Sequence, residues 1–282
     1  MPSHSSQSSP SSIVLDSVTE LPPRSVYPVL LTGSHGGAYA AQFALARGVR
    51  AALFHDAGSG KDNAGIACLQ IFGTLGLPCA AVDSWSARIG NARDTLERGC
   101  VSHANAAAMA LGIEARMRVA DALTAFQGVS ATGASLEDFM PGSETRTALN
   151  IEGARRAVWL LDSASLICPR DAGAVVVTGS HGGLPGNDPA RAAKAQVFCA
   201  LFNDAGIGRD EAGIHRLAAL EGRGIAGATV AALSARIGEA ASTLETGIVS
   251  RVNALGVELG GGEGMSAREF VELAARHGTG RD

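Results

Sequence analysis

The chain has 282 residues, of which 46% are hydrophobic and 18% charged, with 36 glycines and a formal net charge of -4. This composition is typical of a globular protein rich in tight turns, and it excludes a fibrous or largely disordered chain. The negative charge, without a basic stripe interleaved with aromatic residues, argues against nucleic acid as a partner. No apolar run approaches the roughly 20 residues of a membrane span, so no membrane partner is expected.

Residues 1–12, with the sequence MPSHSSQSSPSS, lack the basic and apolar blocks of a secretory signal, and we expect them to form a disordered tail. The five cysteines show neither a CxxC motif nor the Cys/His spacing of a zinc site. We interpret them as reduced, mostly buried thiols of a cytoplasmic protein. These cysteines are Cys68, Cys79, Cys100, Cys168 and Cys199.

Short apolar runs that end in turn residues predict the strands. Runs this continuous are typical of strands covered on both faces, and hence of a parallel sheet with helices between the strands. The first part of the chain has four, at residues 13–17, 28–37, 50–58 and 78–84. The second part has four more, at residues 159–163, 174–183, 197–206 and 226–234.

Two kinds of helix are expected between and after these strands. Residues 210–224 place Leu217 and Leu220 on one apolar face, with Asp210 in the N-cap position. After each SARIG motif, small polar residues at helical spacing predict a helix that packs closely between the two parts of the chain, with Asn105 and Asn253 as candidate ligand contacts. That face comprises Thr95, Gly99, Ser102 and Asn105, and then Thr243, Gly247, Ser250 and Asn253.

The two parts repeat one another. TGSHGG stands at 32–37 and 178–183, ALFHDAGSGKDNAGI at 52–66 matches ALFNDAGIGRDEAGI at 200–214, and SARIG recurs. Two copies are too few for a solenoid, so the pattern predicts two similar three-layer α/β lobes, derived from an internal duplication and related by a pseudo-twofold axis. The predicted divisions are a tail (1–12), a first repeat (13–125), a connection (126–158) that can fold over a site, and a second repeat (159–282).

The TGSHGG loops carry the candidate site. Glycines after a strand permit close backbone approach and can present N–H groups to an anion or an oxyanion. The alternative is a plain turn whose serine and nearby aspartate only cap backbone groups. We expect substrate contacts from Ser34, Gly36, Gly37, Ser180, Gly182 and Gly183.

His35 and His181 are the candidate general bases, because imidazole titrates near neutrality. Asp56 and Asp204 follow the next predicted strand in each repeat, and a carboxylate there would orient the imidazole and raise its basicity. One histidine and one aspartate per lobe are too few ligands to predict a metal.

The SARIG motifs offer a second set of candidates. Arg88 and Arg236 can clamp a carboxylate or phosphate, and Ser86 and Ser234 can add a hydroxyl. An arginine that forms a salt bridge to the other lobe is the equally weighted alternative.

The copies also differ, which favours an asymmetric substrate in one shared cleft. His55 faces Asn203, Asp83 faces Ala231 and Trp85 faces Leu233 in the aligned segments. Tyr39 follows the first glycine loop, whereas LPGNDPARAAK follows the second.

Three well-known functional motifs are incomplete, absent or wrongly placed in this sequence. AGSGKD lacks features of a phosphate loop, no G-x-S-x-G occurs, and the one G-x-G-x-x-G match, at Gly222, leaves a helix and enters a strand. No dinucleotide or other cofactor is therefore predicted.

The leading hypothesis is a cofactor-independent enzyme that acts on a small polar carboxylate or amide, as a hydrolase of an amide or ester, with a His/Asp general base and a glycine-loop oxyanion site. The alternatives are a two-base isomerase or racemase that uses the two histidines, and a non-catalytic small-anion binding protein. The expected partner is a small-molecule substrate, and a homo-oligomer is compatible with the sequence.

Overall fold

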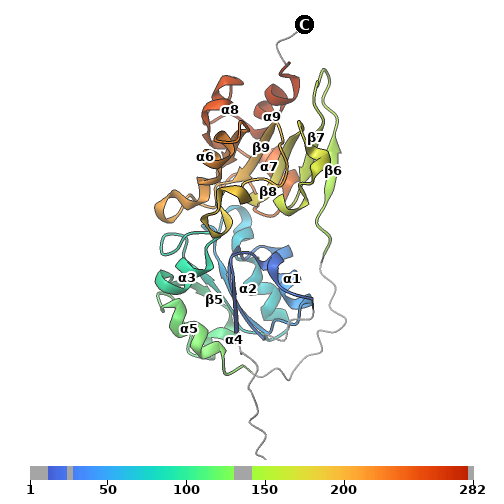
Figure 1. Ribbon diagram of the computed structural model, residues 1–282. Coiled ribbons are helices and arrows are strands. Elements are labelled where there is room, and N and C mark those ends of the chain that lie inside the picture. Colours follow the sequence, from blue (N-terminus) through green and yellow to red (C-terminus); the bar gives the residue numbers. More distant parts are fainter. Residues whose placement is uncertain (1–11, 24–27, 130–141, 279–282) are drawn as a thin grey trace, which may run out of the picture.

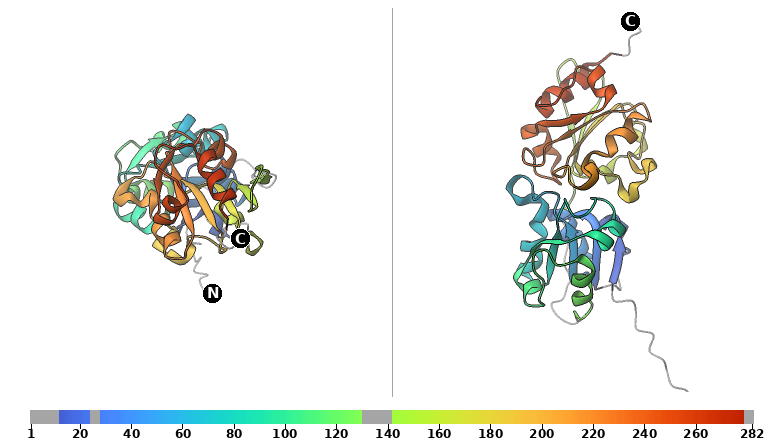
Figure 2. Two further views of the ribbon diagram at one scale, coloured as in Figure 1. Left: turned by 90° about the horizontal axis from the view of Figure 1, so that it is seen from above. Right: turned by 90° about the vertical axis from the view of Figure 1, so that its left-hand side faces the viewer.

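The computed structural model describes residues 12–23, 28–129 and 142–278. The predicted tail lies outside the described residues except for Ser12. Two sheets organise the chain, and we call residues 12–129 the first lobe and residues 142–278 the second lobe. The lobes are stacked along the long axis of the molecule (Figures 1 and 2).

The first lobe holds a five-stranded sheet in the order β1-β2-β3-β4-β5. Strands β1 to β4 are parallel to their neighbours, and β5 pairs with β4 in the antiparallel direction. The strands are β1 (Ser12–Leu15), β2 (Val29–His35), β3 (Ala51–His55), β4 (Cys79–Val82) and β5 (Val101–Ala104).

The second lobe holds a six-stranded sheet in the order β11-β10-β9-β8-β7-β6. Strands β7 to β10 are parallel, whereas both edge strands, β6 and β11, are antiparallel to their neighbours. The strands are β6 (Arg146–Leu149), β7 (Val158–Leu161), β8 (Val175–His181), β9 (Cys199–Asn203), β10 (Ala226–Val230) and β11 (Val249–Val252).

Helices cover both faces of each sheet because the strands bury apolar side chains on both sides. In the first lobe, Leu30 and Phe54 contact one apolar cluster, and Leu31 and Leu53 contact the other. The predicted α/β fold with parallel-dominated sheets is confirmed. The helices are α1 (Ala38–Ala46), α2 (Ala67–Thr74), α3 (Ala92–Arg98), α4 (Ala106–Met109), α5 (Val119–Phe126), α6 (Arg216–Glu221), α7 (Ala240–Thr246), α8 (Ala254–Glu258) and α9 (Ala267–Arg276).

Short 3-10 helices complete the connections. They are η1 (Val18–Glu20), η2 (Lys61–Ile66), η3 (Ala164–Leu166), η4 (Pro169–Asp171), η5 (Pro185–Asn187), η6 (Pro189–Arg191) and η7 (Arg209–Ile214). Where α1 follows the first glycine loop, η5 and η6 follow the second. No helix among the described residues is long and apolar enough to cross a membrane.

The predicted helix through residues 95–105 is wrong. Helix α3 ends at Arg98, Ser102 lies in β5, and Asn105 caps the separate short helix α4. A Cβ on Gly99 would lie 2.9 Å from both Val119 Cγ2 and Val82 Cγ1, so the chain packs tightly there and turns into the edge strand. The same change from helix to strand occurs between α7 and β11.

The predicted N-cap at Asp210 is also wrong. Asp210 and Glu211 have φ values of 52° and 55°, inside η7, and α6 begins only at Arg216. Two successive left-handed residues cannot continue a right-handed helix. Asp62 and Asn63 share this conformation ahead of α2.

The carboxyl ends of the parallel strands meet where the lobes touch. The loops after β3 and β9 approach so closely that a Cβ on Gly58 would lie 3.1 Å from the Cα of Gly206, and both glycines have positive φ. The backbone N–H of Lys61 donates to Ala232 O at 2.8 Å, and that of Arg209 donates to Ser84 O at 2.7 Å. The interface therefore brings the repeated polar loops together.

Candidate active site

A small cavity of about 80 Å³ lies between the lobes at the ends of β2 and β8. Both predicted histidines line it, together with both serines of the TGSHGG motifs. We call it the histidine cavity. Its polar lining consists of Ser17, Thr19, Ser34, His35, Tyr39, Glu144, Asp162, Ser163, Ser180 and His181.

The two imidazoles meet edge to face, with ring centroids 6.2 Å apart and planes at 82°. Burial, followed by the nearby His55, lowers the pKa of His35 to about 4. Burial also lowers the pKa of His181 well below its ordinary value, and the Arg216 guanidinium adds to this shift. Both rings are therefore neutral at pH 7.

Backbone hydrogen bonds determine the tautomer of each ring. The Gly37 N–H donates to Nδ1 of His35, and the Gly183 N–H donates to Nδ1 of His181, each at 3.1 Å. A neutral imidazole that accepts at Nδ1 carries its proton on Nε2. Each ring thus offers an N–H donor, a role different from the general base inferred from the sequence.

The two predicted orienting carboxylates hold loops. Asp56 Oδ1 accepts from Gly58 N at 2.9 Å and from Ser84 N at 3.0 Å. Asp204 Oδ1 makes the equivalent bonds to the Gly206 and Ala232 amides, both at 2.9 Å. Glycine amides, not these carboxylates, orient the histidine rings. The two carboxylates instead stabilise the loops at the lobe interface by accepting backbone hydrogen bonds.

The glycine-loop amides are also engaged within the protein. The N–H groups of Gly36 and Gly182 donate to the carbonyl oxygens of His55 and Asn203, at 2.9 and 2.7 Å. Those of Gly37 and Gly183 hold the imidazoles. These four amides thus already have acceptors within the protein, where they join neighbouring strands and fix the histidines, and the oxyanion role that the sequence suggested for them stays a prediction.

Ser34 and Ser180 lie beside the histidines on the cavity wall. Ser34 Oγ accepts from Val18 N at 2.9 Å, and Ser180 Oγ accepts from Ala164 N at 2.8 Å. Each hydroxyl oxygen thus accepts a hydrogen bond from the first residue of a neighbouring 3-10 helix. Its O–H group can still donate a hydrogen bond to another acceptor.

The SARIG arginines form ion pairs across the lobe interface. Arg88 Nε lies 2.8 Å from Asp210 Oδ2, and Arg236 Nε lies 2.7 Å from Asp62 Oδ2. This is the salt-bridge alternative considered for these arginines. Neither arginine lines the histidine cavity.

The remaining predicted contacts serve the backbone. Ser86 Oγ donates to Asp83 O and Ser234 Oγ donates to Ala231 O, both at 2.7 Å. Asn105 Oδ1 accepts from the Cys79 and Ala108 amides, and Asn253 makes matching bonds to Gly227 and Gly256. None of these four side chains lines the histidine cavity.

Glu144 is the site residue that sequence reasoning missed. It lies just before β6 and lines the histidine cavity, where burial raises its carboxyl pKa despite a hydrogen bond to Ser163. Burial, together with the charge of Glu144, raises the pKa of Tyr39. The sequence gives only a general indication of Glu144, namely that the connection 126–158 can fold over a site.

His55 and Asn203 are one of the differences between the repeats from which we predicted an asymmetric substrate. The two side chains make equivalent backbone hydrogen bonds. His55 Nδ1 accepts from Ala57 N at 3.1 Å, and its Nε2 lies 3.0 Å from Ala87 O. The Asn203 amide accepts from Ala205 N and donates to Ala235 O, at 2.9 and 3.1 Å.

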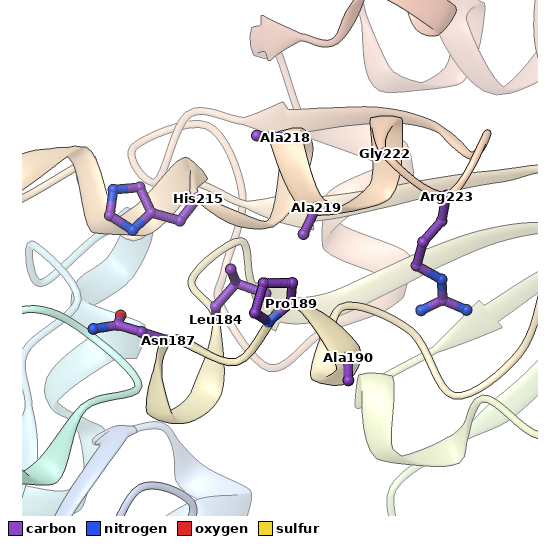
Figure 3. Close-up of a pocket in the computed structure, with 9 residues that line it drawn as sticks. All are labelled: Leu184, Asn187, Pro189, Ala190, His215, Ala218, Ala219, Gly222 and Arg223. Carbon is purple, nitrogen blue, oxygen red and sulfur yellow. The ribbon is translucent and has the colours of Figure 1, made fainter.

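A larger hollow of about 800 Å³ lies on the second lobe, between η5, η6 and α6. Figure 3 shows Leu184 and Pro189 next to each other on one side of it and Ala219 on the other, with Arg223 at one end. Its lining is mostly apolar and contains none of the predicted site residues. The histidine cavity is therefore the better candidate for chemistry.

Within the described residues, no group of three or more His, Cys, Asp or Glu side chains could hold a metal ion. All five cysteines are free thiols, and Cys68, Cys79 and Cys199 are buried. Comparisons of the chain with family models, curated proteins and solved structures found no match.

Proposed function

We propose that the protein is a cofactor-independent enzyme that acts on a small polar carboxylate or amide in the histidine cavity, by hydrolysis of an amide or ester bond. The observation that carries this proposal is the pair of neutral imidazoles, each with its proton on Nε2, on the wall of one small cavity that the half-buried carboxyl group of Glu144 also lines. Fixed N–H donors and a carboxylate base are the two components that addition to a carbonyl requires.

In the proposed mechanism, the substrate carbonyl oxygen accepts hydrogen bonds from Nε2–H of His35 and His181. Ionised Glu144 removes a proton from a water molecule, and the resulting hydroxide forms a bond to the carbonyl carbon. The negative charge that develops on oxygen is stabilised by the two imidazole donors. The bond to nitrogen or alkoxide oxygen then breaks, and the leaving group takes the proton from Glu144.

The raised pKa of Glu144 supports this role. A carboxyl group whose pKa moves toward neutrality both accepts and returns a proton more readily at pH 7 than one with an ordinary pKa. The neutral state of the histidines supports the donor role in turn, since an imidazolium would be far more costly to bury.

The second candidate is an isomerase. With both Nε2 atoms protonated, neither histidine can remove a proton, which argues against the two-histidine scheme. A carboxylate base with a neutral imidazole donor is, however, an established arrangement for removing a proton next to a carbonyl. Glu144 would then move a proton at carbon.

An internal duplication is part of the proposal. The TGSHGG loops end β2 and β8, and matching hydrogen bonds hold His35 and His181. We infer a pseudo-twofold relation between the lobes. Each lobe would then contribute one imidazole donor to the substrate, whereas the base, Glu144, comes from the second lobe alone.

The test is an assay of the purified protein against a panel of small amides, esters and hydroxy acids, followed by NMR in D₂O. We expect one substrate class to be hydrolysed, and Glu144→Gln to lower turnover by about 10² or more. Glu258→Gln, a change of an exposed carboxylate in α8, is the matched control and should retain full activity. Full activity of Glu144→Gln would contradict the proposal.

The same assay separates the alternatives. Exchange of a carbon-bound proton for deuterium, without release of a leaving group, would favour the isomerase. Binding of small anions with no turnover of any panel member would favour the non-catalytic binding protein.

A further inference from the structure

A second cavity, of about 270 Å³, adjoins the histidine cavity. The two share Ser17, Thr19, Ser163, Ser180 and His181 on their walls. The remainder of the second cavity is formed by η3, η5, η6 and the start of α6. We call this cavity the basic annex, because Arg191, Lys194 and Arg216 line it and, among the residues that the structure describes, no carboxylate does.

The three cations of the annex are not equally neutralised. Arg191 forms an ion pair with Glu20, and its NH1 lies 4.0 Å from Asp16 Oδ2. Lys194 Nζ donates to Ser165 O at 2.7 Å, but among residues 12–23, 28–129 and 142–278 no carboxylate lies within ion-pair distance of it. The Lys194 charge is thus not neutralised by an ion pair, although it acts on Glu144 from a greater distance and lowers the pKa of that carboxyl group.

Arg216 brings a buried charge to the same wall. It is 4% exposed, and its guanidinium lies over the Phe202 ring. Its NH1 and NH2 groups donate to Ala192 O at 2.6 Å and to Gly183 O at 2.9 Å. In the part of the chain that the structure describes, its buried Nε has no hydrogen-bond partner, and no carboxylate forms an ion pair with it.

We propose that the basic annex binds an anionic group of the substrate, a carboxylate or a phosphate, while the reacting carbonyl lies between His35 and His181. The proposal rests on the proposed function for the position of the carbonyl. A buried cation that only carbonyl dipoles neutralise gains more from a bound anion than an exposed, paired arginine does. The anchor predicted at Arg88 and Arg236 is thus replaced by Lys194 and Arg216.

The three cations of the annex all come from the second lobe, whereas the first lobe contributes only Ser17 and Thr19 to its wall. In the aligned segments Cys68 stands where the second lobe has Arg216, and α1 occupies the chain positions that η5 and η6 take after the second glycine loop. The positive charges therefore lie on one side of a site to which each lobe contributes one histidine. The substrate therefore binds in one orientation, with its anionic end toward η6 and its carbonyl between the imidazoles.

The test is isothermal titration calorimetry with two probes, malonate and inorganic phosphate. Wild type should bind at least one of them, and the tighter probe identifies the anionic group. Lys194→Gln should weaken that binding about tenfold, because it removes one charge-assisted contact. Lys194→Arg keeps the charge and should stay within about twofold of wild type.

Arg88→Gln is the matched control, because it removes the same charge from a residue outside the annex. The proposal is overturned if wild type binds neither probe, or if Lys194→Gln and Arg88→Gln weaken binding equally. Failure of the proposed function is a different result: Glu144→Gln would keep its turnover while the effect of Lys194→Gln on probe binding persisted.

Discussion

The imidazole rings of His35 and His181 meet edge to face across the lobe interface, at a centroid distance of 6.2 Å. Each Nδ1 atom accepts a hydrogen bond from the amide of a glycine two residues later. The repeated TGSHGG motif therefore places two oriented, uncharged imidazoles on the wall of one cavity. The consequences for stability and activity can be measured separately.

The lowered histidine pKa values predict a loss of stability in acid. Unfolded His35, with an ordinary pKa of 6.5, binds a proton as the pH falls below that value, whereas the folded group binds it only near pH 4. The unfolded state therefore takes up more protons between about pH 6.5 and 4, and the free energy of unfolding falls in that window, by up to about 3 kcal/mol from this group. Chemical denaturation at pH 7.5 and pH 4.5 measures it.

His35→Gln should lessen this acid sensitivity, because it removes the titrating group. The control is His103→Gln, which changes an exposed histidine in β5. An equal pH dependence in wild type and His35→Gln would show that His35 is not held neutral by the fold.

His55→Asn should be tolerated, because Asn203 makes the corresponding pair of backbone hydrogen bonds in the second lobe. We expect a loss below about 1 kcal/mol in the free energy of unfolding at pH 7. His55→Ala should cost about 2–4 kcal/mol, since it leaves Ala57 N and Ala87 O unpaired and opens a cavity. Equal losses for the two variants in urea denaturation would refute this equivalence.

Arg88→Gln should change little. The Arg88 and Asp210 side chains are 27% and 49% exposed, and ion pairs of this kind contribute about 0.2–1 kcal/mol. Turnover on the substrate identified by the panel should stay within about twofold of wild type, with no increase in KM. A large rise in KM would indicate that Arg88 binds the substrate, as the sequence predicted, and would contradict this expectation.

Gly33→Ala should destabilise the protein by about 2–4 kcal/mol, because the added methyl group meets backbone on three sides. A Cβ there would lie 2.6 Å from Asn91 N, 2.7 Å from Gly90 C and 2.9 Å from Asp16 O. Gly262→Ala is the control, since a Cβ on Gly262 would have nothing within 4 Å of it. Thermal denaturation that gave equal midpoints for the two variants would be evidence against this close packing.

The sequence predicted the parallel strands because their apolar runs are buried on both faces. It missed β5 and β11, whose exposed or half-buried residues, such as His103 and Arg251 respectively, carry no such signal. A helical spacing from Thr95 to Asn105 was misleading, because a turn at Gly99 intervenes. Local spacing does not record where the chain changes direction.

The sequence predicted that the two histidines face a common cavity, but it did not predict which ring nitrogen of each carries the proton. The tautomer of His35 depends on the Gly37 amide, and the environment of Glu144 depends on a segment that reaches the cavity only after folding. Neither has a sequence signature. The aspartates were assigned to the histidines from chain order alone, whereas the fold uses Asp56 and Asp204 to hold backbone amides.

The most direct test of the account is the protonation of the two histidines, measured by ¹⁵N NMR of the imidazole nitrogens between pH 4 and pH 8. We predict that at pH 7 both His35 and His181 are neutral with the proton on Nε2, and that His35 titrates only near pH 4. A proton on Nδ1 of either ring, or titration of His35 near its ordinary pKa of 6.5, would contradict the account.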